Sequence, residues 1–226
     1  MKRLFLLMAM FVPVMAGLGV YSWWKSKNQQ EVVEQKITPS ASSVVDMGDY
    51  RLFKPAKLLN NFTLNSGTSS FSNGLLLGKW TFVMFGYTHC PDICPTTLTR
   101  AKGVYQQLKN IAPVQIMFVS ADPLRDDAKR LTQYVGYFDK EFIGATANHD
   151  KLFPFAQNLL LPYGIIAKKT SEDYAVSHSA SIALINPQGK LHAHFKPIHN
   201  VGEVPIVDMN LMADSFNDIV AKTALN

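Results

Sequence analysis

Residues 80–95 have the sequence WTFVMFGYTHCPDICP. The first part, residues 80–85, is apolar apart from one β-branched threonine, which is typical of a buried strand. Cys90 and Cys94, the two cysteines of the chain, follow in a loop. Pro95 then fits the first position of a helix, where its missing N–H would be unpaired anyway. The stretch therefore predicts a strand, a loop and a helix, and α/β folds place their sites at such junctions.

Strands and helices alternate along the rest of the chain as well. Apolar segments predict further strands at residues 114–119, 142–145, 181–185 and 191–195. Apolar faces at helical spacing predict helices after Pro95, at 126–138, at 150–160 and near the C-terminus, where Met212, Phe216, Ile219 and Val220 share one face. The turn Asn-Pro-Gln-Gly at 186–189 predicts a hairpin. This order predicts an α/β fold for residues 56–226: a thioredoxin-like sandwich with a central mixed sheet and flanking helices.

A long uncharged segment lies near the N-terminus. Lys2 and Arg3 precede 21 uncharged residues at positions 4–24. At a rise of about 1.5 Å per residue, a helix of this length covers the roughly 30 Å hydrocarbon core of a bilayer. We expect residues 1–24 to form a transmembrane helix with its N-terminus in the cytoplasm. A cleaved signal peptide ending near Ala16 is the less favoured alternative, because the apolar run continues past that residue.

The basic charge of the chain lies mainly in its first quarter. The chain has 22 Lys+Arg against 17 Asp+Glu, a net charge of +5. Residues 1–57 hold 8 basic and 4 acidic side chains, whereas residues 58–226 hold 14 and 13. Residues 25–55 are polar without a sustained period and predict a flexible tether. The predicted domain is nearly neutral, which argues against nucleic acid as a partner.

Cys90 and Cys94 predict a site for a soft metal ion. Pro95 disfavours helical geometry at Cys94, so Cys94 is expected at the mouth of the helix and Cys90 in the preceding loop. The helix dipole favours thiolates there. Thiolates select Cu(I), or Cu(II) when an imidazole completes the site. The alternatives are two buried free cysteines or a structural disulfide, whereas two cysteines are too few for an all-cysteine zinc site.

The third ligand would come from the six histidines of the chain. His89 adjoins a cysteine, but adjacent side chains usually point apart. His149 lies in a polar turn and is expected at the surface. His192 and His194 alternate on one face of a strand, which is either exposed or part of a site. His178 lies on a loop that enters the sheet, and spacing alone leaves the choice among these residues open.

Residues 85–98 (FGYTHCPDICPTTL) form the longest of three blocks that resemble one protein family. The others are residues 119–126 (VSADPLRD) and 174–179 (YAVSHS), the latter ahead of 184–189 (LINPQG). In this order they are similar to the Sco/SenC family of copper-binding, thioredoxin-fold proteins, and the resemblance covers residues 55–222. It implies that Cys90, Cys94 and His178 bind copper together. It also implies a single-pass inner-membrane protein whose globular domain lies in the periplasm, or in the intermembrane space in mitochondria.

The same resemblance implies a function. The chain would be a copper metallochaperone rather than an enzyme, carrying Cu(I) or Cu(II) to the CuA centre of cytochrome c oxidase during assembly. Its partner would be the copper-bearing oxidase subunit or another periplasmic copper or thiol protein. The alternative is a thiol–disulfide oxidoreductase in which Cys90 and Cys94 form a redox-active disulfide and reduce partner cysteines. Redox or copper sensing is a lesser alternative.

Two further segments receive no ligand role. The block at residues 119–126 contains Asp122-Pro123, which predicts a turn before a helix, and it is expected to be structural. Residues 195–199 (FKPIH) look like the Phe-x-Pro-Pro-His stretch of bacterial family members, but Ile198 replaces the second proline. No function is therefore assigned to His199.

Overall fold

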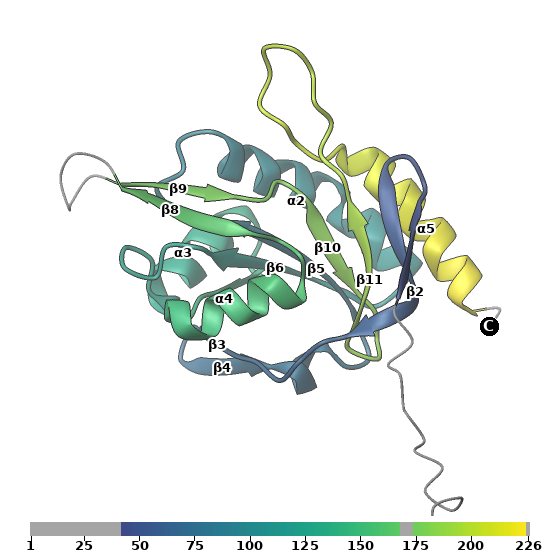
Figure 1. The fold of residues 1–226 in the computed structure, drawn as a ribbon, viewed down its shortest axis with the longest axis horizontal. Helices are drawn as coiled ribbons and strands as arrows, with labels where there is room; N and C mark the ends of the chain where they lie inside the picture. The colour runs from purple at the N-terminus through teal and green to yellow at the C-terminus, as the bar shows by residue number, and fades with distance from the viewer. Residues whose placement is uncertain (1–41, 168–173, 225–226) are drawn as a thin grey trace, which may run out of the picture. The chain divides into compact units, whose positions relative to one another are not determined.

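The structure is a computed structural model that describes residues 42–167 and 174–224. A seven-stranded sheet forms its centre, with the strand order β1-β2-β11-β10-β5-β6-β7 (Figure 1). In that order the strands are β1 (Ser43–Asp46), β2 (Tyr50–Leu58), β11 (Lys190–Phe195), β10 (Ile182–Ile185), β5 (Trp80–Gly86), β6 (Val114–Ser120) and β7 (Ile143–Ala145). No helix in the described ranges is both long and apolar enough to cross a bilayer. The predicted anchor at residues 1–24 lies outside those ranges.

One half of the sheet is parallel and the other half is antiparallel. β5 pairs in parallel with β6, and β6 with β7. β10, β11, β2 and β1 add antiparallel partners on the other side of β5. The five predicted strands are all present, each end within one residue of its predicted position. The predicted turn joins β10 to β11, where Gly189 has a φ of +71° and its N–H donates to the Asn186 carbonyl (2.8 Å).

Helices cover both faces of the sheet. Alternation along β5 sends Phe82 and Met84 to one face and Val83 and Phe85 to the other. The first face packs against α2 (Ile93–Ile111), α3 (Ala128–Phe138) and α5 (Met209–Ala224). The second packs against α4 (His149–Asn158), the hairpin of β3 (Thr63–Ser66) and β4 (Ser69–Ser72), and the 3-10 helix η1 (Asn73–Leu76). The predicted α/β sandwich with a central mixed sheet is confirmed.

The folded part begins earlier than the predicted boundary at residue 56. The sequence predicts a tether over residues 25–55, yet β1 and most of β2 fall within that range and pair with the sheet. Tyr50 and Phe53 are the buried side chains of β2, and the residues between and after them are more exposed. Such a sparse apolar pattern does not distinguish a strand from a polar linker. The rest of the predicted tether, residues 25–41, lies outside the described residues.

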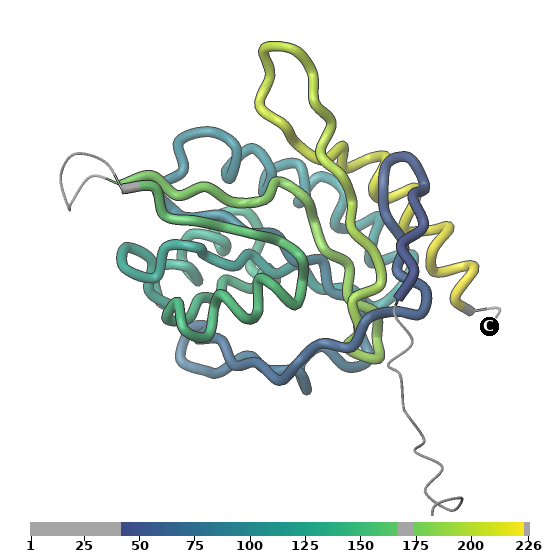
Figure 2. The backbone as a smooth tube through the Cα atoms, in the orientation of Figure 1, coloured from purple at the N-terminus to yellow at the C-terminus, as the bar shows by residue number. Residues whose placement is uncertain are grey.

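A separate hairpin lies beside the main sheet. β8 (Tyr163–Ala167) and β9 (Tyr174–His178) pair antiparallel as a two-stranded sheet of their own. Figure 2 shows the backbone of this hairpin extending beyond the sheet toward the left of the view. The sequence does not predict either strand, because Val176 is the one fully buried residue of β9. His178 therefore lies at the end of a strand and not on a loop, as the sequence had suggested.

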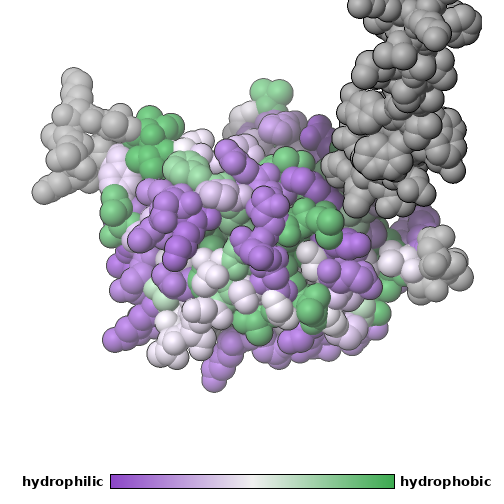
Figure 3. All heavy atoms as spheres, turned by 60° about the horizontal axis from the view of Figure 1, so that its bottom comes forward, coloured by the Kyte–Doolittle hydropathy of each residue, from purple (hydrophilic) through white to green (hydrophobic). Residues whose placement is uncertain are grey.

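One face of the molecule is mostly hydrophilic. Figure 3 brings the bottom of Figure 1 forward, and polar side chains cover most of the surface in that view. Hydrophobic side chains appear on it as small, separate patches. Scattered apolar side chains are normal on the surface of a folded domain.

Candidate metal centre

The cysteine loop leaves the sheet at the carboxyl end of β5, as predicted. Gly86 ends β5 directly beneath the site: a Cβ atom added there would lie 2.8 Å from Cys94 Sγ and 2.4 Å from the ring of Phe118. Contacts below 3.0 Å are not possible without a shift, so the close approach requires glycine.

Helix α2 begins two residues earlier than the sequence predicted. Its first residue is Ile93, and the Thr96 N–H donates to the Asp92 carbonyl (3.2 Å) to close the first turn. Pro95 therefore sits at the third helical position and Cys94 at the second. A proline is tolerated there because the first four N–H groups of a helix have no intrahelical partner. Cys94 is thus inside the first turn of α2, and Cys90 is in the preceding loop.

The two cysteines are unpaired and lie against each other. Cys90 is 8% exposed and Cys94 is 3% exposed. The backbone N–H of Cys94 donates to Cys90 Sγ (3.4 Å), and the two side chains are also hydrogen-bonded to each other. Cys90 is therefore placed where the N-terminal amides of α2 stabilise negative charge.

The side chains of the two cysteines differ in protonation. The pKa of Cys90 is lowered to about 4, first by a hydrogen bond from the Cys94 side chain, then by His178 and the backbone amides of Cys94 and Asp92. The pKa of Cys94 is raised, because its proton is held by Cys90 and because the side chain is buried. At neutral pH the pair is one thiolate, Cys90, and one thiol, Cys94.

This asymmetry predicts the pH profile of alkylation in the metal-free protein. Iodoacetamide should label Cys90 at a nearly constant rate from about pH 8 down to about pH 5, because the thiolate is retained until the pH approaches its pKa of about 4. The rate at each cysteine is measured by peptide mass spectrometry. In the urea-unfolded protein the rate should instead fall about tenfold per pH unit below about pH 8. The same steep slope in the folded protein would show that Cys90 is an ordinary thiol.

His178 meets the cysteines from the end of β9. Its Nε2 lies 3.7 Å from Cys94 Sγ. Its Nδ1 lies 3.1 Å from the Ser179 carbonyl, which can accept only if Nδ1 carries the proton. That hydrogen bond leaves Nε2 as the ring nitrogen that faces the cysteines. The His178 ring also packs edge-on against Tyr87, with 6.1 Å between ring centroids. A histidine held in this way by its other ring nitrogen is the usual arrangement of a metal ligand.

The donor set suits a soft metal ion. Cys94 and His178, but not Cys90, line a cavity of about 20 Å³, which has room for roughly one small atom. Two sulfurs and one imidazole nitrogen are ligands that favour copper among the common metal ions. In residues 42–167 and 174–224, no three His, Cys, Asp or Glu side chains already form a grouped metal site. The structure nevertheless brings the three predicted residues to one place: Cys90 Sγ lies against Cys94, and Cys94 Sγ lies 3.7 Å from His178 Nε2.

The other histidines have separate surroundings. His89 is exposed, and its Nδ1 lies 3.8 Å from Asp126 Oδ1. His149 is at the start of α4 and its Nδ1 lies 2.9 Å from the hydroxyl of Tyr163, so it is only partly at the surface. His199 is exposed and lines a cavity away from the cysteines.

His192 and His194 do not share a face of β11, which corrects the sequence prediction. His192 packs edge-on against Trp80, whereas His194 packs edge-on against Phe53. These aromatic partners belong to opposite faces of the sheet. The reason is a register shift between Leu191 and Ala193, which a strict two-residue period cannot anticipate. Burial lowers the pKa of both rings, that of His194 to about 4.

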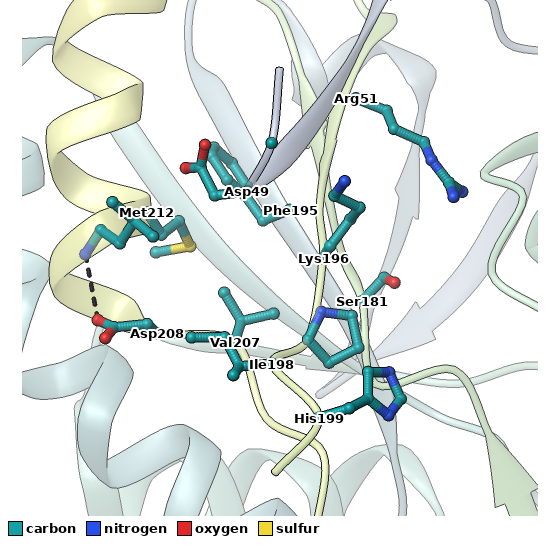
Figure 4. Close-up of a pocket in the computed structure, with 13 residues that line it drawn as sticks. Asp49, Arg51, Ser181, Phe195, Lys196, Ile198, His199, Val207, Asp208 and Met212 are labelled. Carbon is teal, nitrogen blue, oxygen red and sulfur yellow. Dashed lines mark hydrogen bonds between the residues drawn. The ribbon is translucent and has the colours of Figure 1, made fainter. Parts of the chain in front are cut away.

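A large cavity lies away from the cysteines. It has a volume of about 550 Å³ and opens between the start of β2, the end of β11 and α5 (Figure 4). Its charged lining residues are Asp49, Arg51, Lys196, His199 and Asp208. Two of its carboxylates already have partners: Asp49 accepts from Ser215 (2.5 Å), and Asp208 accepts from backbone amides at the start of α5. None of the predicted copper ligands lines it.

The block at residues 119–126 supports the site through two buried carboxylates. Asp126 accepts hydrogen bonds from the Thr88 amide (2.8 Å), the Thr88 hydroxyl (2.5 Å) and the Ser120 hydroxyl (2.6 Å), and so holds the cysteine loop. Asp122 accepts from the hydroxyl of Tyr174 on β9 (2.5 Å). The sequence predicts that residues 119–126 are structural, but it does not predict these hydrogen-bond partners. Two carboxylates just after a buried strand next to β5 are the signal that could have indicated them.

Comparisons with known proteins identify the family to which this chain is related. The family model described as SCO1/SenC matches residues 53–206. A protein of Stutzerimonas stutzeri is 40% identical over 128 residues, 56% of this chain and 62% of its own length. The mitochondrial SCO2 homologue of Homo sapiens is 31% identical over 179 residues, 77% of this chain and 63% of its own. The chain thus spans less than two thirds of the length of these curated relatives.

Solved structures show the same fold. The copper-bound ScoI of Arabidopsis thaliana is 27% identical, with a TM-score of 0.63 over 72% of this chain and 98% of its own. BsSco, a member of the Sco family of cytochrome c oxidase assembly proteins, is 22% identical, with a TM-score of 0.53 over 73% of this chain and 94% of its own. The family match covers most of the chain and includes both cysteines and His178. The chain belongs to the SCO1/SenC family.

Proposed function

We propose that this protein is a membrane-anchored copper metallochaperone that delivers copper to the CuA centre of cytochrome c oxidase during assembly. The observation that carries the proposal is the meeting of the Cys90 thiolate, the Cys94 thiol and His178 Nε2 at one end of the sheet. Copper is the cargo of this site, and the family's place in cytochrome c oxidase assembly supports the choice of recipient.

The charges of the site suit either oxidation state of copper. Once Cys94 has lost its proton, the two thiolates carry two negative charges. They leave a net charge of −1 with Cu(I) and balance Cu(II), so a neutral imidazole is the appropriate third ligand. His178 is oriented for this role by its hydrogen bond to the Ser179 carbonyl.

Transfer proceeds by ligand exchange. Cys90 lies in the loop before α2 and, at 8% exposure against 3%, is the less deeply buried of the two cysteines. A thiolate of the recipient can reach the ion from that side and replace the protein ligands one at a time. The recipient would be the copper-bearing subunit of the oxidase, or another copper or thiol protein in the same compartment.

The proposed location is the periplasmic side of the inner membrane. It is supported by the 21 uncharged residues at positions 4–24, which follow two basic residues. A membrane anchor would keep the copper site near a membrane-embedded oxidase.

Loss of the histidine ligand tests the proposal. His178→Asn should lower copper affinity by at least the roughly 10–100-fold that removing an outer-shell partner costs, because an amide replaces the imidazole nitrogen. The affinity is measured by competition with a chelator of known strength. His199→Asn is the matched control, because His199 lines a different cavity. If His178→Asn binds copper like the wild type and cells carrying it assemble active oxidase, the proposed ligand role is wrong.

A second candidate function is thiol–disulfide exchange, which the Cys90 thiolate favours. The Cys90 thiolate would attack a partner disulfide and release one partner thiolate. Cys94 would then lose its proton and attack the mixed disulfide, which releases the second partner thiol and leaves a Cys90–Cys94 disulfide. The partner gains the two electrons that the cysteine pair loses. A reduction potential of the pair above that of the partner disulfide would exclude this role.

A further inference from the structure

Arg125 lies between the two segments that carry the candidate copper ligands. Its guanidinium carbon is 3.9 Å from the ring centroid of Tyr174, on β9, and 5.9 Å from that of Tyr87, in the cysteine loop. Both distances are within the range at which a cation is attracted to an aromatic face. One cationic side chain therefore contacts the strand that ends at His178 and the loop that leads to Cys90.

Asp122 fixes Arg125 in this position. The Arg125 Nε donates to Asp122, whose other oxygen accepts from the hydroxyl of Tyr174 (2.5 Å). Asp122 is 1% exposed, so this carboxylate is a rigid point of attachment. Arg125 Nη2 is buried and has no hydrogen-bond partner among the described residues. The side chain thus stays where the rings and one carboxylate place it, although one of its donors is unsatisfied.

The hairpin that carries His178 is attached to the core mainly through β8, where the ring of Tyr163 stacks on Phe85 and Phe153, and the β9 side has fewer attachments. β8 and β9 form a two-stranded sheet separate from the main sheet, and an isolated hairpin is marginally stable in water. On β9, Val176 is the one fully buried side chain. Tyr174, Val176 and His178 are at alternate positions, so they share one face of the strand. Holding the ring of Tyr174 therefore helps to set the direction in which His178 points.

We propose that Arg125 is a positioning residue for copper binding: it clamps β9 against the cysteine loop and thereby keeps His178 Nε2 within reach of Cys94. The proposal rests on the proposed function, because it concerns the geometry of the same site. Arg125 has no direct role as a ligand. It acts through His178, and a lysine cannot replace it because an ammonium group lacks the planar surface that stacks on Tyr174.

A double-mutant cycle separates this role from a general effect of charge or stability. Copper affinity is measured by chelator competition for the full chain carrying Arg125→Met, His178→Asn or both. Methionine keeps an unbranched stem of similar length and removes the charged plane. We expect Arg125→Met to weaken copper binding by about 10–100-fold in the wild-type background and by less than about twofold in the His178→Asn background. Arg125→Lys should behave like Arg125→Met.

A spectroscopic readout reports the histidine directly. In the Cu(II)-loaded protein, Arg125→Met should reduce the nitrogen hyperfine signal of the imidazole, as His178→Asn does, while the thiolate-to-copper absorption remains. Arg100→Met is the matched control, since Arg100 is exposed on α2, and it should leave both signals unchanged. Thermal unfolding of the metal-free variants checks the fold. If Arg125→Met does not fold, Tyr174→Leu removes the stacking ring instead and should give the same pattern.

The possible outcomes are distinct. Wild-type affinity and an intact nitrogen signal in Arg125→Met would overturn the proposal. An equal loss of affinity in both backgrounds would also overturn it, because Arg125 would then act independently of His178. If His178→Asn itself binds copper normally, the assignment of the ligand fails, which is a failure of the proposed function rather than of the clamp alone.

Discussion

Replacing Cys94 with serine is expected to abolish stoichiometric copper binding. Cys94 is 3% exposed, lies at the second position of α2 and approaches His178 Nε2 to 3.7 Å. Serine keeps the size of the side chain but replaces a soft, ionisable sulfur with a hydroxyl that stays protonated at neutral pH. The copper affinity should therefore fall by more than about 100-fold, beyond the loss expected when an outer-shell partner is removed.

The measurement is copper per chain after desalting, with a chelator competition for the residual affinity. Cys90→Ser and the double serine variant serve as references, and all three should retain little copper. Metal-free thermal unfolding should be nearly the same for wild type and Cys94→Ser, because the two side chains are similar in volume. Normal copper content in Cys94→Ser would place the metal elsewhere in the protein and would remove the basis of the proposed function.

Replacing Gly86 with alanine should damage both the fold and the site. The added Cβ would lie 2.4 Å from the ring of Phe118, which is 1% exposed, and 2.8 Å from Cys94 Sγ. Neither neighbour is free to move aside, because the ring is enclosed in the core and the sulfur is inside the first turn of α2. Overpacking of this kind costs about 1–3 kcal/mol of unfolding free energy. A displaced Cys94 should also weaken copper binding.

Urea unfolding of the metal-free protein measures the first effect, and chelator competition measures the second. Gly103→Ala is the matched control: Gly103 lies in the interior of α2, and a Cβ there meets no heavy atom within 4 Å. That substitution should stabilise the protein by about 0.5–1 kcal/mol, because alanine is the better helix former. If Gly86→Ala is as stable as the wild type and binds copper normally, the contact beneath Cys94 has no functional importance.

The sequence predicts the centre of the fold better than its edges. Strands β5 and β6 are continuous apolar runs of buried residues, so their pattern identifies them without the structure. Buried and exposed side chains do not alternate regularly along β2, which lies one strand from the edge of the sheet. The sequence therefore predicts that the tether continues to residue 55. His192 and His194 lie on opposite faces of β11 because of a local register shift, and the sequence pattern does not reveal such a shift.

The candidate site was only partly predictable for a related reason. The location of Cys90 and Cys94 follows from local sequence, because a strand, a loop and a helix are adjacent along the chain. His178 is 84 residues from Cys94 and reaches it through a hairpin with little apolar character. Spacing could not select it, and the family resemblance was needed. The sequence does not predict the supporting roles of Asp122 and Arg125, because both residues contact Tyr174, which is about 50 residues further along the chain. Arg125 also contacts Tyr87, which lies in the cysteine loop.

The ends of the seven-stranded sheet have a consequence for solubility at high concentration. Its outermost strands are short: β1 has four residues and β7 has three. The long apolar strands β5 and β6 lie inside, with each edge hydrogen-bonded to a neighbour. An exposed edge of unpaired amides and carbonyls invites strand addition from another molecule, and short edges offer few such groups. Many copies crowded together would therefore have little opportunity to join edge to edge into aggregates.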